Sequence, residues 1–132
     1  MGKIFCISLP IKIESEGNNH DHYMQRYRRL KKQTRAIKWG LVTCDIKPPC
    51  RVRLTRVAPR ALDKVDNLRT AMKHVIDAVA SHMLPHLKAG RADGCKDIEW
   101  QIDQVKDKPK EYGLRIEIEQ YENDYSKLRG SH

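Results

Sequence analysis

The sequence predicts an α/β fold in which a mixed sheet of about four strands is covered by two main helices, in the order β-α-β-α-β-β. Three observations carry this prediction. Residues 51–58 and 98–105 alternate between apolar and polar side chains, as a strand with two different faces requires. Residues 66–83 repeat apolar side chains at helical spacing. Residues 21–39 form a second helical stretch, in which cations dominate.

Size and composition limit the class of protein. With 132 residues and 39% hydrophobic content, the chain is expected to form a single domain over residues 1–129. Gly130 to His132 resemble the start of an expression tag and carry no functional argument. A mean hydropathy of −0.72 argues against a membrane-spanning helix. No signal-peptide pattern is visible at the start, so a cytoplasmic protein is expected.

The chain is strongly basic. It has 26 Lys and Arg against 17 Asp and Glu, which gives a formal net charge of +9. A surplus of this size favours a polyanionic partner, and nucleic acid first. The four cysteines are scattered without a Cys-x-x-Cys pair, so neither a disulfide framework nor a zinc knuckle is expected.

The first two predicted elements are a strand and a basic helix. Residues 3–13 are rich in β-branched and apolar side chains, and Pro10 suggests an edge position or a bulge. The helix over residues 21–39 is expected to have a thin apolar stripe made of Met24, Tyr27, Leu30, Thr34 and Ile37. Residues 26–38 contain seven cations and no acid, which favours a phosphate-contacting surface over an ordinary solvated face. The expected DNA contacts on this helix are Arg26, Arg28, Arg29, Lys31, Lys32 and Arg35.

The next strand and helix have the most regular pattern. The strand at 51–58 is expected to direct one set of side chains inward, Val52, Leu54 and Val57, and another set outward, Arg51, Arg53 and Thr55. Asp66 or Asn67 is expected to cap the following helix, which ends before Pro85. Two cations near this helix, Arg60 and Arg69, join the expected DNA contacts.

The C-terminal third predicts two further strands. A loop over residues 85–97 contains the turn signal Asp93-Gly94. Strands are expected at 98–105 and at 112–121. The short Lys- and Pro-containing turn between them suits an antiparallel hairpin of these two strands.

Acids gather on one edge of the central helix. At about 100° per residue, Lys73 and Asp77 each lie within roughly 20° of Asp66 when viewed down the helix axis. Along the axis, Asp66 and Asp77 are about 16 Å apart, so they cannot share one metal ion by themselves. Because Mg²⁺ needs carboxylate oxygens, Asp63 and Asp93 are the candidates to complete a site with Asp66. Each acid also has a structural interpretation, as a helix cap for Asp66, a helix ion pair for Asp77 and a turn residue for Asp93.

With these residues the sequence resembles the RusA-type endodeoxyribonucleases, the Holliday-junction resolvase family common in phages and prophages. The similarity runs in order through nearly the whole chain. The Asp66-Asn67-Leu68 motif with Lys73-x3-Asp77 is its most specific part. The supporting segments are residues 14–18, 53–60, 62–65, 93–94, 98–100 and 112–118, together with Gln104.

The resemblance implies a homodimer that binds four-way DNA junctions and cuts them symmetrically with Mg²⁺, or with Mn²⁺ in its place. A metal-bound water would attack phosphorus. By position, the resemblance makes Asp66 and Asp93 metal ligands and Lys73 the catalytic lysine. Asp63 and Asp77 are the further acids of the predicted metal site.

One departure from the family pattern leaves an alternative open. Lys64 stands where the family has its first acid, and Asp63 lies one residue earlier. A bulge of one residue at this loop-to-helix junction would return Asp63 to the site, and we favour this interpretation. Otherwise the chain is a catalytically impaired protein that still binds junctions or other DNA. An RNA-binding module is disfavoured, because Tyr23 and Tyr27 alone do not supply its aromatic platforms.

Overall fold

The structure has the predicted order of elements. The computed structural model describes residues 2–13, 23–62, 65–84, 97–108 and 111–121, with only the backbone of residues 65–67. The elements are β1 (Ile4–Leu9), α1 (Tyr23–Gly40), β2 (Cys50–Ala58), α2 (Val65–Met83), β3 (Ile98–Lys106) and β4 (Gly113–Gln120). The predicted α/β fold with a four-stranded mixed sheet and two helices is therefore confirmed. In the described ranges, neither helix combines the length and apolar character that crossing a membrane requires.

The sheet has the strand order β1-β4-β2-β3. β4 is antiparallel to both β1 and β2, whereas β2 and β3 are parallel. The predicted hairpin of the last two strands is wrong, because β2 lies between them. The reason is that α2 acts as the crossover helix that parallel neighbours such as β2 and β3 require. β4 then takes the other side of β2, where Leu114, Ile116 and Ile118 become fully buried.

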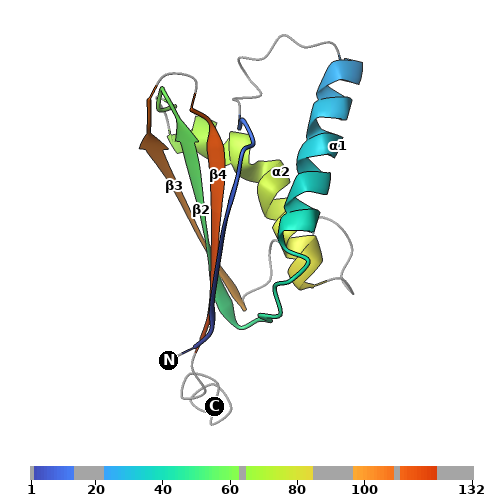
Figure 1. Cartoon of the computed structure of the whole chain (residues 1–132), viewed down its shortest axis with the longest axis vertical. Helices are drawn as coiled ribbons and strands as arrows, with labels where there is room; N and C mark the ends of the chain where they lie inside the picture. The colour runs from blue at the N-terminus through green and yellow to red at the C-terminus, as the bar shows by residue number, and fades with distance from the viewer. Residues whose placement is uncertain (1, 14–22, 63–64, 85–96, 109–110, 122–132) are drawn as a thin grey trace.

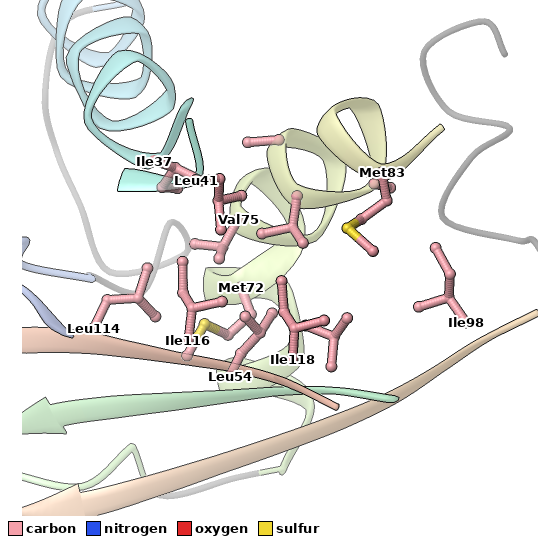
Figure 2. Close-up of a cluster of buried hydrophobic side chains, with 14 of the residues drawn as sticks. Ile37, Leu41, Leu54, Met72, Val75, Met83, Ile98, Leu114, Ile116 and Ile118 are labelled. Carbon is pink, nitrogen blue, oxygen red and sulfur yellow. The ribbon is translucent and has the colours of Figure 1, made fainter. Parts of the chain in front are cut away.

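Both helices pack on the same face of the sheet, so the molecule has two layers (Figure 1). The core lies between α2 and the central strands. Figure 2 shows Val75 and Met83 of α2 above β4, whereas Met72 of α2 reaches in among Leu54, Ile116 and Ile118. The predicted apolar stripe of α2 is confirmed, since its members are buried apart from the half-buried Ile76. This packing fixes which edge of α2 faces solvent.

The other face of the sheet is open and charged. Arg51 pairs with Glu119 at 3.0 Å, and Arg53 pairs with Asp103 at 3.4 Å. Thr55 was expected to be exposed on this face, but it is buried because Arg115 and Asp103 flank it in register on the neighbouring strands. Val57 was expected to point inward and is only half-buried, because the inward positions of β2 are Val52, Leu54, Arg56 and Ala58.

Helix α1 departs from its predicted packing. Met24 and Tyr27 were expected in its buried stripe, but they are 42% and 59% exposed. Figure 1 shows the cause, because only the C-terminal half of α1 packs on α2 while its N-terminal half lies away from the sheet. Ile37, in the packed half, is fully buried. The expected cap of α2 is also wrong, since the helix begins at Val65 and Asp66 lies inside its first turn.

Candidate functional site

Helix α2 carries the residues that were predicted to act in chemistry. Because Met72 and Val75 are fully buried, the rotation of the helix is fixed. Lys73 is then exposed, and Asp77, one turn later on the same edge, is half-buried. Asp66 is the second residue of the helix and lies about two turns before Lys73. One edge of α2 thus carries the predicted lysine between two predicted acids.

A cleft of about 650 Å³ lies between α2 and β3, and Lys73 lines it. α2 also contributes Arg69, one turn before Lys73, while β3 contributes Trp100 and Ile102. Both cations are exposed, and Trp100 is half-buried. Two cations therefore stand beside an apolar wall. This arrangement suits a phosphate group, which accepts charge-assisted hydrogen bonds from such donors.

The segment that leads into α2 is attached to β3 by Gln104. The backbone N–H of Leu62 donates to Gln104 Oε1 at 2.9 Å, and Gln104 Nε2 donates to the Leu62 carbonyl at 3.1 Å. Leu62 directly precedes Asp63 and lies four residues before Asp66. Gln104 faces the same side of β3 as Trp100 and therefore fixes this segment against a wall of the cleft.

Arg56 is a buried cation on the helix-covered side of β2, with 7% exposure. Its Nε donates to the Ile13 carbonyl and its Nη1 donates to the Arg60 carbonyl, both at 2.8 Å. In the part of the chain that the structure describes, every buried side-chain nitrogen and oxygen has a hydrogen-bond partner. Arg56 thus joins the end of the segment after β1 to the turn that leads toward Asp63.

The predicted DNA-contacting cations lie mainly on the solvent side of α1. Arg29 is half-buried, whereas the others are exposed, namely Arg26, Arg28, Lys31, Lys32 and Arg35 on α1 and Arg60 and Arg69 elsewhere. The structure brings Arg69 into the cleft with Lys73. The α1 cations form a separate basic surface, on a helix that contacts α2.

The described side chains do not bring the four predicted metal ligands together. Asp63 and Asp93 lie outside the described residues, and of Asp66 only the backbone is described. Asp77 is about 16 Å from Asp66 along the helix axis. Among described residues, no three His, Cys, Asp or Glu side chains form a group that could hold a metal ion. The Mg²⁺ site therefore stays a prediction.

Two groups in the loop that follows α1 have shifted pKa values. Lys3 Nζ donates a hydrogen bond to Asp45 Oδ2 at 3.1 Å. This bond, together with the charge of Lys3, holds the pKa of Asp45 below its usual value. Burial raises the pKa of the Cys44 thiol. Neither group lines the cleft beside Lys73, so these shifts concern the loop rather than the candidate site.

Three residues that the structure brings to attention were not among the predicted site residues. Arg56 and Gln104 were part of strand patterns, in which side-chain bonds to distant backbone cannot be read. Trp39 was only the last residue of a predicted helix, yet it is 72% exposed. It lines a groove of about 740 Å³ between α1 and α2, together with Tyr27 and others. The signal that could have revealed the groove is the predicted stripe of α1 itself, because Tyr27, Leu30 and Thr34 of that stripe line it.

Comparisons with known proteins identify no relative of this chain from which a function could be inferred. The chain matches no protein-family model, and no curated protein matches its sequence. The fold and the cleft define a basic two-layer α/β protein in which one helix carries two acids and the two cations that line the cleft.

Proposed function

We propose that this protein is a Mg²⁺- or Mn²⁺-dependent endodeoxyribonuclease that hydrolyses phosphodiester bonds in Holliday junctions or other branched DNA. The observation that carries the proposal is the cleft where Arg69 and Lys73 stand together on the helix that also holds Asp66 and Asp77. The resemblance to RusA-type endodeoxyribonucleases supports the same activity. The protein would work as a homodimer in the cytoplasm, because a symmetric cut across a four-way junction needs two sites.

In this proposal the cleft binds the phosphate that is cut. Arg69 and Lys73 donate hydrogen bonds to its non-bridging oxygens and stabilise the negative charge that grows on them in the transition state. Asp77, one turn after Lys73, would orient the ammonium group. Mg²⁺ would be held by Asp66 with Asp63 and Asp93, and it supplies an activated water and a Lewis acid for the phosphoryl oxygen.

The basic surface of α1, apart from Lys31 and Arg35 at its edge toward α2, binds a duplex arm of the same substrate. Its cations neutralise phosphates without reading bases, so this binding weakens steeply as salt rises. Because α1 and the cleft are on different sides of α2, the two contacts can fall on different arms. A branched substrate therefore fits the charge distribution better than one straight duplex.

The test is cleavage of a labelled four-way junction with Mg²⁺ or Mn²⁺, repeated with EDTA. Asp66→Asn should lower the rate by more than about 100-fold, since even residues that only support a metal ligand are worth 10- to 100-fold. Lys73→Ala should lower it by about 100-fold or more, the usual loss for one donor to a transition state. Asp103→Asn is the matched control, because Asp103 pairs with Arg53 on the open face of the sheet.

Two outcomes would overturn the proposal. Undiminished cutting by Asp66→Asn would remove the predicted site from the chemistry. Junction binding without cleavage by the wild-type protein, with every divalent ion tried, would favour the alternative that Lys64 has replaced a necessary acid. The chain would then be a DNA-binding protein that has lost catalysis.

A further inference from the structure

The groove between α1 and α2 exposes large apolar side chains to solvent. Its volume is about 740 Å³, which lies within the roughly 300–1,000 Å³ of typical ligand pockets. Tyr27, Trp39 and Val42 line it and are 59%, 72% and 65% exposed. α2 contributes His74. Two aromatic rings and an aliphatic side chain thus remain open to solvent on a highly charged protein.

The rim of this groove is positively charged. Lys31, Arg35 and Lys38 line it, and none of the described residues that line it is acidic. The Lys31 ammonium lies 5.8 Å from the centroid of the Tyr27 ring, so a cation stands directly beside an exposed aromatic face. An occupant that fits this groove therefore carries negative charge close to a flat apolar surface.

We propose that this groove binds unpaired nucleotides of a DNA single strand, with bases stacked on Trp39 and Tyr27 and phosphates beside Lys31, Arg35 and Lys38. Stacking on aromatic side chains combined with a cationic track is the general chemistry of single-strand binding. Duplex DNA does not match as well, because its bases are stacked on each other and only its phosphates face outward. The inference rests on the DNA-binding part of the proposed function and names the form of DNA that this surface takes.

A second copy of the chain fits this groove less well than a nucleotide strand. In a symmetric dimer, the same patch of each subunit would face the other. Lys31, Arg35 and Lys38 of one copy would then meet the same cations of its partner, and α1 has no acid to pair with them. Charge complementarity therefore selects a polyanion over self-association.

The location of the groove suits a branch point. His74 lines the groove and Lys73, its neighbour in sequence, lines the cleft on the other flank of α2. A strand that leaves a duplex arm in the cleft could reach the groove by passing over one helix. Unpaired nucleotides next to a junction are the part of branched DNA that has free bases to stack.

The experiment measures equilibrium binding without divalent ions. Three labelled probes of equal length are compared: an oligothymidylate, an oligomer of abasic residues and a duplex. Trp39→Ala should weaken binding of the oligothymidylate by roughly 5- to 150-fold, the range for loss of one stacked base, and leave the abasic oligomer unaffected. Ile4→Ala is the matched control, because Ile4 is 70% exposed but lies on β1.

Tryptophan fluorescence gives a second readout. The chain has two tryptophans, and Trp39 is the more exposed. Oligothymidylate should quench the wild-type protein, whereas Trp39→Phe should bind it with nearly unchanged affinity and lose most of the quenching. Since Trp39 is exposed, neither substitution should unfold the protein.

Equal binding of oligothymidylate and abasic oligomer by the wild-type protein would overturn the inference, because charge alone would then explain the contact. Loss of self-association in Trp39→Ala, measured by sedimentation, with unchanged affinity for single strands would also overturn it and assign the groove to a second copy. These results are separate from the nuclease test. Stacking without cleavage refutes only the nuclease, and cleavage without stacking refutes only this inference.

Discussion

The attachment of Leu62 to Gln104 is expected to control both stability and cleavage. Gln104→Ala removes two hydrogen bonds, of 2.9 and 3.1 Å, to the backbone of Leu62. Each neutral hydrogen bond contributes about 0.5–1.5 kcal/mol, so the loss should be about 1–3 kcal/mol in the free energy of unfolding. Urea unfolding of the variant and the wild type measures this difference.

The effect on cleavage follows from where these bonds act. The two bonds hold Leu62, the residue that precedes Asp63. They therefore stabilise the observed arrangement of the segment that leads into α2. If about 2 kcal/mol of this stabilisation is lost, the equilibrium constant for the competent arrangement falls roughly 30-fold, and the rate falls by up to the same factor. Single-turnover cleavage of a four-way junction, at a temperature where the variant is folded, is the assay.

Gln101→Ala is the matched control, because Gln101 lies on the same strand but accepts its bond from Arg53 on the exposed face. It should leave cleavage unchanged. Hydrogen exchange at the Leu62 amide adds a readout that needs no activity, since this amide is the donor to Gln104. A Gln104→Ala protein that unfolds more easily but cuts at the wild-type rate would refute the positioning role. An unchanged exchange rate at Leu62 would refute the attachment itself.

Two further predictions test the basic surface and the buried cation. The first neutralises three cations of α1, namely Arg28, Lys31 and Lys32. This change should reduce the slope of log affinity for DNA against log salt by up to about 3. An unchanged slope would show that this helix does not face DNA. Arg56→Met should lower the free energy of unfolding by about 2–4 kcal/mol, because hydrogen bonds from a charged group contribute roughly 1.5–3 kcal/mol each and Met refills part of the space. Arg53→Met, on the exposed face of the same strand, should change it by about 0.5 kcal/mol or less in urea unfolding, and an equal loss for both would contradict the importance of burial.

The fold could be predicted where local pattern and final packing agree. The apolar stripe of α2 is long and regular, and it becomes the centre of the core. Strand β2 could be located from its alternating apolar and polar residues, because this local pattern also matches its packing in the sheet. Strand neighbours could not be predicted this way, because pairing depends on contacts between segments that are far apart in the sequence. A short turn between β3 and β4 suggested a hairpin, yet the crossover through α2 places β3 on the far side of β2.

The candidate site could be predicted only as a set of residue types. Helical spacing placed Lys73 and Asp77 on one edge of α2, and the structure confirms that Lys73 is exposed there. The partners of that edge come from β3, and no local pattern connects Trp100 or Gln104 to α2. Arg56 could not be predicted for the same reason. A cation in a strand pattern is expected to face solvent, whereas Arg56 is buried and donates hydrogen bonds to two backbone carbonyls.

The acid that completes the site, if it precedes α2, must come from a short stretch of the chain. Arg56 holds the Arg60 carbonyl and Gln104 holds both backbone groups of Leu62, so the chain is attached to the sheet up to the residue before Asp63. The helix begins at Val65, and its rotation is fixed by the core. Only residues 63 and 64 lie between these points. One of them is an acid and the other a lysine, and we predict that Asp63 is the one that completes the metal site.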